Sequence, residues 1–363
     1  MHIVHVTCAH DWNDVRIYER MAASAARDGL RVTIVCPAPA GEAPAPIPGI
    51  EVACIERPSS RARRFLAAAP AACRLAASLG ADAYQLHDPE LVPWAMRWPR
   101  LARRAIFDSH EDVAAGLLGR AWIPAPVRPA VAASTRIVLG ALLPRVAATI
   151  AATPAIYEKL PRSNRLAVVQ NFPPAGESKP RPAARERVGA YVGTLNSVRG
   201  AEVVWQAAAL LSRRAITIEV AGPVRERPAC ADGDAQPVLL GNLDRAGVDR
   251  LLSRAAVGIV LFQPEPNHVA SQPNKIFEYM AAGVPVVASD FPLWRKLVVD
   301  TGAGLVVDPR NPAAAAEAMA RIIDDPSSAR RMSEAGVAAI RDRFSWEPEW
   351  HKLRDAYRRT AHA

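Results

Sequence analysis

The sequence has few cysteines and few aromatic residues. Its 363 residues include 5 cysteines, and Phe, Trp and Tyr together make up 6%. The cysteine count is odd, the spacing does not match a metal site, and most cysteines fall in apolar strand or helix patterns. Residues 1–7 have the pattern of a strand rather than of a signal peptide. These features predict a soluble cytoplasmic protein with reduced core cysteines.

Several functional motifs are also missing. The most apolar long region, residues 130–153, contains Arg136 and Arg145, so it is not expected to span a membrane. The sequence has no P-loop and no Gly-x-Ser-x-Gly motif. No Asp-x-Asp motif stands where a metal–diphosphate site would need one, and Asp232-Gly-Asp234 is typical of a turn. We therefore expect metal-independent chemistry and no cofactor.

Positive charge exceeds negative charge, with a formal net charge of +9. Clustered arginines attract anionic lipid headgroups or nucleic acid. No aromatic residues are interleaved with these clusters and no nucleic-acid-binding motif accompanies them, so we expect no nucleic-acid partner. A solvated surface is the simpler interpretation, and peripheral contact of the first domain with the inner membrane face stays open. The clustered residues are Arg61, Arg63, Arg64, Arg97, Arg100, Arg103 and Arg104.

Short apolar runs alternate with helical stretches along the chain, and half of all residues are hydrophobic. This alternation is typical of an α/β fold with parallel sheets covered on both faces. In the first half, strands are predicted at residues 3–7, 32–36, 83–86, 105–107, 149–151 and 166–169, and a helix at 14–27. In the second half, strands are predicted at residues 188–192, 216–221, 238–240, 257–262, 284–288 and 304–307, and helices at 200–211 and 244–254.

The alternation is interrupted at residues 173–187, where four prolines among charged residues are typical of an interdomain linker. We therefore predict a first domain over 1–172, a linker over 173–187, a second domain over 188–345 and a last helix within 346–363. Doubly wound domains bind ligands at the carboxyl ends of their strands, and two of them would face one cleft.

The most informative stretch is residues 271–289. Ser271 and Asn274 are suited to cap a helix, and Lys275 adds positive charge to its first turn. Unpaired amides at the start of a helix attract anions. Glu278 lies on the same face as Asn274 by i,i+4 spacing. This combination suits a nucleoside diphosphate, with ribose hydroxyls on Glu278; the alternative is an ordinary helix–strand unit with solvated charges.

A second candidate anion site follows the first strand of the second domain. Gly193 permits close approach of the backbone to a ligand. Arg199, at the mouth of the next helix, is placed to reach a diphosphate.

These two segments resemble those of retaining GT-B glycosyltransferases in the large family with a Glu-x7-Glu motif, and the likeness covers nearly the whole chain. It implies two doubly wound, Rossmann-like domains, with the last helix crossing back to the first. Glu278 matches the second Glu of the motif, whereas Ala270 stands at the first, and Glu265 lies too early to replace it. Arg199 stands where a Lys is usual, and Thr194 where an Arg is common.

The resemblance implies a donor site for a nucleoside diphosphate sugar in the second domain. Backbone groups of residues 241–243 would meet the nucleobase, and backbone amides of 271–274 would replace the missing first Glu at the sugar. The implied donor-site residues are Gly193, Thr194, Arg199, Gly241, Asn242, Leu243, Ser271, Gln272, Asn274, Lys275 and Glu278.

In the first domain, the resemblance implies that His110 contacts the transferred sugar, although a structural histidine is an alternative. Glu111 either binds the acceptor or belongs with Asp112 to the cap of the next helix. Asp88, at an earlier strand end, is either an N-cap or an acceptor ligand.

The loop after the first strand replaces the Gly-Gly loop that is common in this family. Asn13, Asp14 and Arg16 are therefore candidate acceptor contacts by position only. Capping of the following helix by Asn13 or Asp14 is the alternative.

Together these features predict a metal-independent glycosyltransferase that moves a sugar from a nucleoside diphosphate sugar to an unidentified acceptor with retention of configuration. His110, Arg199 and Lys275 are the expected catalytic residues, with the two cations stabilising the departing diphosphate. Two alternatives stay open. One is a sugar-nucleotide epimerase that uses His110 and Glu111, and the other is a non-catalytic subunit of a polysaccharide assembly complex.

Overall fold

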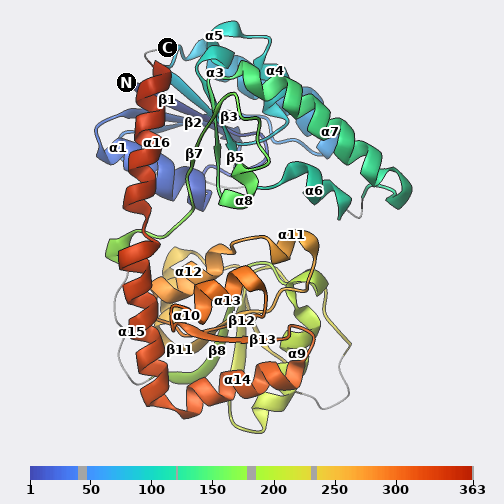
Figure 1. Ribbon diagram of the computed structural model, residues 1–363, viewed down its shortest axis with the longest axis vertical. Coiled ribbons are helices and arrows are strands. Elements are labelled where there is room, and N and C mark those ends of the chain that lie inside the picture. Colours follow the sequence, from blue (N-terminus) through green and yellow to red (C-terminus); the bar gives the residue numbers. More distant parts are fainter. Residues whose placement is uncertain (40–46, 120–121, 178–184, 230–234, 362–363) are drawn as a thin grey trace. The chain divides into compact units, whose positions relative to one another are not determined.

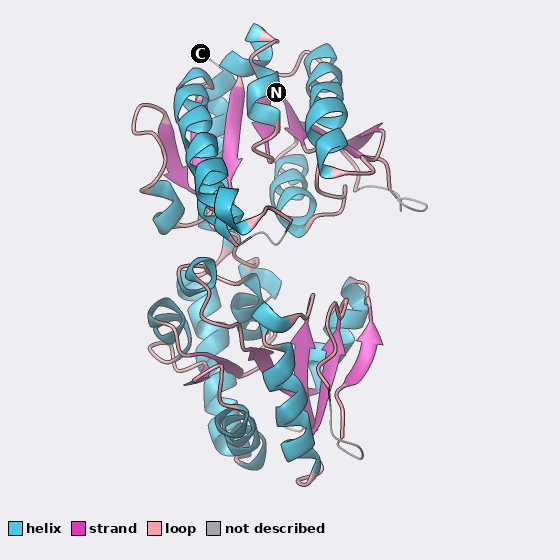
Figure 2. Cartoon of the chain, turned by 90° about the vertical axis from the view of Figure 1, so that its right-hand side faces the viewer, coloured by secondary structure: helices cyan, strands magenta, loops and turns pink. Residues whose placement is uncertain are grey.

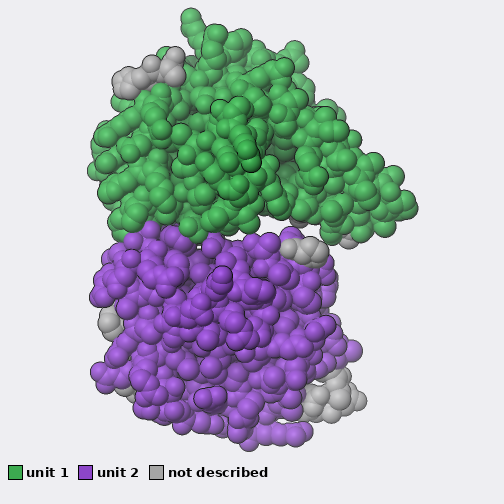
Figure 3. Space-filling model, in the orientation of Figure 1, with its two compact units in different colours: residues 1–171, 346–363 green, residues 172–345 purple. Residues whose placement is uncertain are grey.

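A computed structural model describes residues 1–39, 47–119, 122–177, 185–229 and 235–361. The chain divides into two compact units (Figures 1 and 3). Unit 1 consists of Met1–Asn171 and Trp346–Ala363, and unit 2 of Phe172–Ser345. Within the predicted linker, residues 178–184 lie outside the described residues, as do Asp232 and Asp234 of the predicted turn.

Unit 1 is built on a parallel sheet with the strand order β3-β2-β1-β4-β5-β6-β7. Its strands are β1 His2–Val6, β2 Arg31–Pro37, β3 Ile50–Ile55, β4 Ala83–Leu86, β5 Ala105–Ser109, β6 Ala148–Ala151 and β7 Arg165–Val168. The sequence did not predict β3. This edge strand buries Ile50 and Ile55 but exposes Glu51 and Cys54, so it lacks the continuous apolar run of the central strands.

Helices cover both faces of this sheet (Figure 2). Neighbouring residues of β1 pack on opposite faces, Ile3 with η1, α1 and α16 and Val4 with α3, α4 and α5. The helices of unit 1 are η1 Val15–Ala22, α1 Ala23–Arg27, α2 Arg61–Arg63, η2 Arg64–Ala68, α3 Ala69–Ser78, α4 Leu91–Ala95, α5 Pro99–Arg103, α6 Val113–Leu118, η3 Ala125–Val127, α7 Arg128–Leu142, η4 Leu143–Arg145, α8 Pro154–Tyr157 and α16 Trp346–Ala361.

The helix predicted at residues 14–27 has two parts. It begins as the π-helix η1 and continues as the α-helix α1. Asp14 is its N-cap, because the Asp14 carboxylate accepts hydrogen bonds from the backbone N–H groups of Arg16 and Ile17.

Unit 2 has a second parallel sheet with the strand order β10-β9-β8-β11-β12-β13. Its strands are β8 Glu186–Val192, β9 Thr217–Ala221, β10 Val238–Gly241, β11 Ala255–Val260, β12 Val286–Ser289 and β13 Gly304–Val307. Its helices are η5 Ala175–Glu177, η6 Ser197–Arg199, α9 Ala201–Ser212, α10 Arg245–Arg254, α11 Pro266–Val269, α12 Asn274–Ala281, α13 Pro292–Val298, α14 Pro312–Asp324 and α15 Pro326–Arg343.

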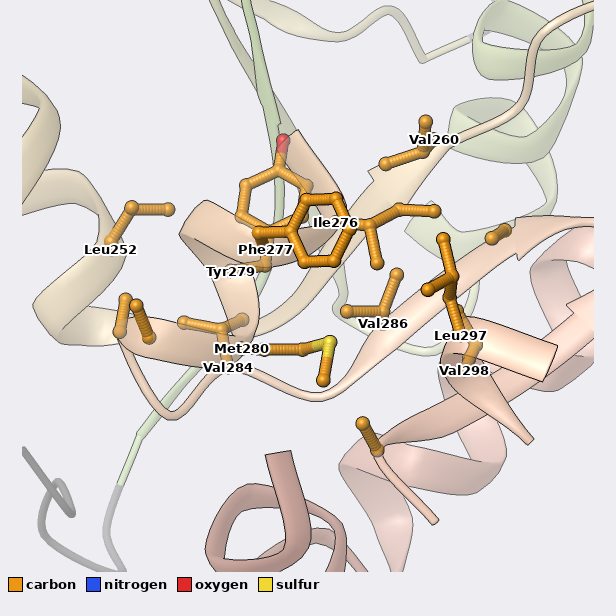
Figure 4. Close-up of a cluster of buried hydrophobic side chains, with 14 of the residues drawn as sticks. Leu252, Val260, Ile276, Phe277, Tyr279, Met280, Val284, Val286, Leu297 and Val298 are labelled. Atoms are coloured by element: carbon orange, nitrogen blue, oxygen red, sulfur yellow. The ribbon is translucent and has the colours of Figure 1, made fainter. Parts of the chain in front are cut away.

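Two apolar clusters cover the opposite faces of this second sheet. One includes α9 and α14, and the other includes α10, α12, α13 and α15. Figure 4 shows Ile276, Phe277 and Met280 of α12 among the side chains of β11, β12 and α13. These contacts fix the start of α12 relative to the strand ends beside it.

The last helix, α16, packs on the sheet of unit 1. The indole Nε1 of Trp346 donates to Ser24 Oγ at 2.8 Å, and that of Trp350 donates to Asp28 Oδ2 at 3.0 Å. The buried Tyr357 hydroxyl donates to the Gln85 side chain in β4. A segment that is distant in sequence therefore completes the core of unit 1 (Figure 1).

We expect Trp346→Ala to lower the free energy of unfolding of unit 1 by about 3–5 kcal/mol, the usual loss for a buried large aromatic side chain. Trp346 is 2% exposed and packs in the core, whereas Trp122 is 51% exposed. Trp122→Ala is the matched control and should cost under about 1 kcal/mol. Denaturant unfolding measures both, and equal losses would contradict this account of α16.

Candidate functional site

Three of the predicted donor segments meet at one edge of unit 2. The N–H of Gly193, after β8, donates to Ala221 O at 2.6 Å, and the N–H of Gly222, after β9, donates to Gly241 O at 2.7 Å. A Cβ on Gly222 would lie 2.5 Å from Gly193 O, so the glycine permits this close approach. Gly222 is not among the predicted site residues; its signal in the sequence is the Gly-Pro pair that follows the predicted strand at 216–221.

Lys275 reaches this edge from the first turn of α12. A Cβ on Gly193 would lie 2.8 Å from Lys275 Cε and 2.9 Å from its Nζ, so the ammonium group lies against the backbone of the β8 loop. The same Nζ is 5.3 Å from the ring centroids of both Tyr191 and Phe262. Burial, and then the charge of Arg199, lower the pKa of Lys275 to about 8, although Glu278 partly opposes them.

Arg199 reaches the same place from the 3-10 turn η6, which Asn196 caps by accepting from the Arg199 N–H at 3.0 Å. The Arg199 guanidinium lies 5.6 Å from the centroid of Phe262 and donates to Thr194 O at 3.4 Å. In the part of the chain that the structure describes, neither Arg199 nor Lys275 forms a salt bridge. Two cations therefore share one aromatic ring without a carboxylate bound to either.

The prediction that Ser271 and Asn274 cap α12 is wrong. Pro273 occupies the N-cap position, no side chain caps the helix, and Asn274 is its first residue. The Ser271 hydroxyl instead donates to His268 O at 2.9 Å, while Trp294 Nε1 donates to Ser271 O at 2.7 Å. Tertiary contacts hold this loop, so the first turn of α12 is left without a side-chain acceptor.

The remaining donor candidates lie around this edge. Glu278 is partly buried one turn into α12, and Gln272 is partly buried in the loop before it. Asn242 is exposed and Leu243 partly buried just after β10. Ala270 is exposed at the C-cap of α11.

Unit 1 brings His110 and His10 together at the carboxyl edge of its sheet. Their rings lie 5.3 Å apart, edge to face, and His110 Nδ1 is 3.3 Å from Asp108 O. His10 Nδ1 is 3.4 Å from Asp14, and His10 Nε2 is 3.4 Å from Asp88. His10 is not among the predicted site residues, because its partners come from two different loops.

The surroundings of His10 hold it protonated. Burial has the largest single influence and lowers the pKa of His10. The hydrogen bond to Asp14 and the charges of Asp88, Asp14 and Glu111 outweigh burial and raise that pKa to about 9. His10 is therefore a cation at neutral pH, and it joins the loops after β1 and β4.

Asp88 does not cap the next helix with its side chain. It is 3% exposed, and its Oδ2 accepts from the Thr7 hydroxyl and the Cys8 N–H, both at 2.7 Å. The helix α4 has Glu90 at its N-cap and no side-chain cap bond. Asp88 therefore ties the end of β4 to the end of β1, and its other oxygen faces His10.

Arg16 lies beneath this edge rather than on it. It is 7% exposed, and its Nε and Nη2 donate to the two oxygens of Asp108 at 2.8 and 2.7 Å. Nη2 also donates a hydrogen bond to Val169 O at 3.0 Å. The Asp108 carboxylate accepts a further hydrogen bond from His87 Nδ1 at 3.2 Å. Burial has the largest single influence and raises the pKa of Asp108, but the charges and hydrogen bonds of Arg16 and His87 together hold that pKa well below its usual range. These bonds place Arg16 in a structural role.

The other first-domain candidates have simpler positions. Asn13 and Glu111 are exposed in the loops after β1 and β5. Asp112 caps α6 by accepting from the Ala115 N–H at 3.0 Å. Among the described residues, no group of three or more His, Cys, Asp or Glu side chains is arranged to hold a metal ion.

Comparison with known proteins agrees with this architecture. Residues 15–171 match the glycosyl transferase 4-like domain, and residues 186–325 match the family glycosyl transferases group 1. Together these two glycosyl transferase regions cover most of the chain. The region 186–325 contains the Gly193, Gly241 and Lys275 segments, and the region 15–171 contains Asp88 and His110 but begins after His10.

The curated relatives match only part of this chain. The α-D-kanosaminyltransferase of Streptomyces kanamyceticus is 28% identical over 216 residues, which are 54% of this chain and 54% of that protein. A D-inositol 3-phosphate glycosyltransferase of Corynebacterium urealyticum is 27% identical over 209 residues, 52% of this chain and 49% of that protein. The chain thus spans about half the length of the curated relatives it matches.

Solved structures match nearly the whole chain. Sucrose-phosphate synthase from Thermosynechococcus elongatus superposes with a TM-score of 0.75 at 18% identity, covering 99% of this chain and 98% of that one. Anabaena Alr3699/HepE, in complex with UDP-glucose, gives a TM-score of 0.70 at 15% identity, covering 99% and 100%. At these identities the likeness shows the fold, which is GT-B with two Rossmann-like domains.

We expect Asp14→Asn to lower the pKa of His10 from about 9 toward the ordinary value of 6.5, because it removes the hydrogen-bonded carboxylate. Titration of the His10 ring by NMR measures this change. Asp11→Asn, in the same loop but paired with Arg57, is the matched control and should leave the pKa high.

The raised pKa of His10 also makes the free energy of unfolding depend on pH. Because the folded-state pKa lies above 6.5, the contribution of His10 is complete below pH 6.5 and is lost as the pH rises through about 9. An ordinary His10 pKa in the unmodified protein would contradict the described contacts.

Proposed function

We propose that this protein transfers a sugar from a nucleoside diphosphate sugar to an acceptor, with the donor bound in unit 2. The observation that carries the proposal is the convergence of Arg199 and Lys275 on the ring of Phe262, where neither cation forms a salt bridge with a carboxylate of the described residues. Two close cations repel one another, so the arrangement favours an anion that lies between or beside them. The group 1 match of residues 186–325 supports a donor site in this unit.

A diphosphate fits this place in both charge and geometry. The start of α12 presents amide groups without a side-chain cap, and the missing side chain of Gly193 lets the Lys275 ammonium lie against the β8 loop beside them. As the bond to the sugar breaks, negative charge grows on the diphosphate, and fixed positive groups stabilise it most at that moment. Glu278, one turn along α12, would hold the ribose hydroxyls, and backbone groups of residues 241–243 would contact the base.

We propose that the transfer is metal-independent and retains the anomeric configuration. Arg199 and Lys275 would supply the charge neutralisation that a divalent cation supplies elsewhere. The acceptor would attack the face from which the diphosphate leaves, and a diphosphate oxygen would accept its proton. Retention rests on the family resemblance alone.

In unit 1, we propose that His110 contacts the transferred sugar. We propose that the groups around His10 bind the acceptor. Carboxylates of Asp14, Asp88 and Glu111 surround His10, and such groups accept hydrogen bonds from hydroxyls. A hydroxyl-bearing acceptor therefore suits this edge. The reaction would take place in the cytoplasm, in keeping with free thiols at Cys8, Cys36, Cys54 and Cys73.

Calorimetric titration with UDP, GDP, ADP and dTDP tests the donor site. UDP is the first choice, because the solved structure of Alr3699/HepE holds UDP-glucose. We expect one nucleotide to bind, and Arg199→Ala or Glu278→Ala to weaken it about 10- to 100-fold, the usual loss for a hydrogen bond to a charged group.

The controls for this titration are exposed charges of unit 2. Lys296→Ala in α13 and Glu317→Ala in α14 should leave the affinity unchanged. Binding that is equally strong in all variants would place the nucleotide elsewhere. Conversion of the nucleotide sugar without any acceptor would favour the epimerase.

The affinity for the nucleotide should also depend on pH through Lys275. Its pKa of about 8 keeps the ammonium charged at pH 7 and increasingly neutral above pH 8, where binding should weaken. A bound diphosphate stabilises the charged amine and raises its pKa in the complex, so the affinity should fall between the pKa of the free protein and that higher value. Titrations with nucleotide from pH 7 to 9.5 measure how steeply the affinity falls with pH. Lys275→Ala should bind the nucleotide weakly, and its affinity should change less with pH. The same slope in both proteins would contradict this role.

A further inference from the structure

One face of unit 1 exposes an unusual amount of apolar surface. It is formed by η2, α6, η3 and α7, and we call it the α7 face. Ile137 is 72% exposed, Leu66 65% and Trp122 51%. The large exposed apolar residues of this face are Phe65, Leu66, Leu118, Trp122, Val127, Val131, Ile137 and Val138.

These residues come from separate parts of the sequence but are connected by contacts. The Arg61 guanidinium, next to η2, lies 4.9 Å from the ring of Trp122, just before η3. The Phe65 ring packs against Trp94 of α4, at 6.1 Å between centroids. The helices α6 and α7 pack on each other, as do α4 and α7 (Figure 1). These contacts connect the elements that carry the exposed apolar groups.

The helix at the centre of this face is barely covered by the rest of its unit. Ala125–Arg145 is the one helix among the described residues that is long and apolar enough to cross a membrane by length and composition. Its most apolar stretch of 18 residues has a mean hydropathy of 1.2, and 11% of that stretch is buried. Only a narrow stripe that includes Ala132 and Leu143 is buried. A core helix of this composition would be mostly buried. Packing within unit 1 therefore does not explain why this helix is so apolar.

The two segments that carry these residues have only positive formal charges. Residues 113–157 contain no Asp or Glu and four arginines, and residues 57–81 contain no Asp or Glu and five arginines. The acids beside them are already paired with cations, Glu90 with Arg64 and Asp112, the N-cap of α6, with Lys159. Arg136 lies on the exposed side of α7, beside Ile137. A spanning orientation would place this guanidinium near the middle of a bilayer, which is costly. A helix that lies flat lets its arginines reach the headgroups while its apolar side chains enter the acyl region.

We propose that the α7 face binds the surface of an anionic lipid membrane. Apolar side chains, a tryptophan and arginines without intervening acids are the combination that binds strongly in the interfacial layer. A second copy of this chain fits the face poorly, since the same positive arginines would meet one another. The membrane-bound enzyme would then act on acceptors at that surface. This binding does not depend on the proposed sugar transfer.

Sedimentation with vesicles tests this proposal. The full chain is mixed with phosphatidylcholine vesicles that contain either 30% phosphatidylglycerol or none. We expect binding to the anionic vesicles, at least tenfold weaker binding to neutral ones, and weakening when salt is raised from 0.1 to 1 M. The double variant Ile137→Glu/Val138→Glu should lose at least tenfold in affinity.

A matched control carries the same change on unit 2. Leu210→Glu in α9 and Val299→Glu after α13 replace residues that are 38% and 41% exposed, and they should bind vesicles like the unmodified chain. Because Ile137 and Val138 are exposed, the double variant should keep its thermal unfolding midpoint, which separates lost binding from lost folding. Absence of binding to anionic vesicles, or equal loss in the control, overturns the proposal. So does a dimer of the unmodified chain that the double variant abolishes without any vesicle binding.

Discussion

Because every strand pairing in the described residues is parallel, all strands of a unit end at the same edge of its sheet. This constraint places loops that are distant in sequence side by side, whatever their composition. In unit 2 it brings the loop at Gly193 against the turn at Gly222 and the end of β10 at Gly241. In unit 1 it brings His10 and His110 into contact. The chemistry of each unit follows from which polar residues stand just after its strands.

The elements that the sequence predicted well are those with a strong local pattern. The strand at 83–86 has its predicted bounds, because four buried residues stand between polar neighbours. Edge strand β3 was missed, since an edge position does not require a continuous apolar run. The π-helical part of the first helix could not be foreseen, because the register of backbone hydrogen bonds leaves little mark on composition.

For the site, residue type was easier to predict than the partner of each residue. Arg199 and Lys275 were selected from their places at helix starts, but their shared contact with Phe262 depends on the packing of the strands. Arg16 was selected by position, and only the fold shows that a buried carboxylate, Asp108, holds it. His10 contacts carboxylates from two loops, Asp14 and Asp88, so its environment could not be predicted from the sequence of one segment.

The place of α16 in unit 1 has a consequence for how the protein is made. Unit 2 is a continuous segment, Phe172–Ser345, whereas unit 1 lacks Trp346, Trp350 and Tyr357 until the last helix leaves the ribosome. During synthesis the first sheet therefore exposes the apolar face that α16 will cover, while unit 2 already has its complete sequence. The domain that is translated first is the one that is completed last.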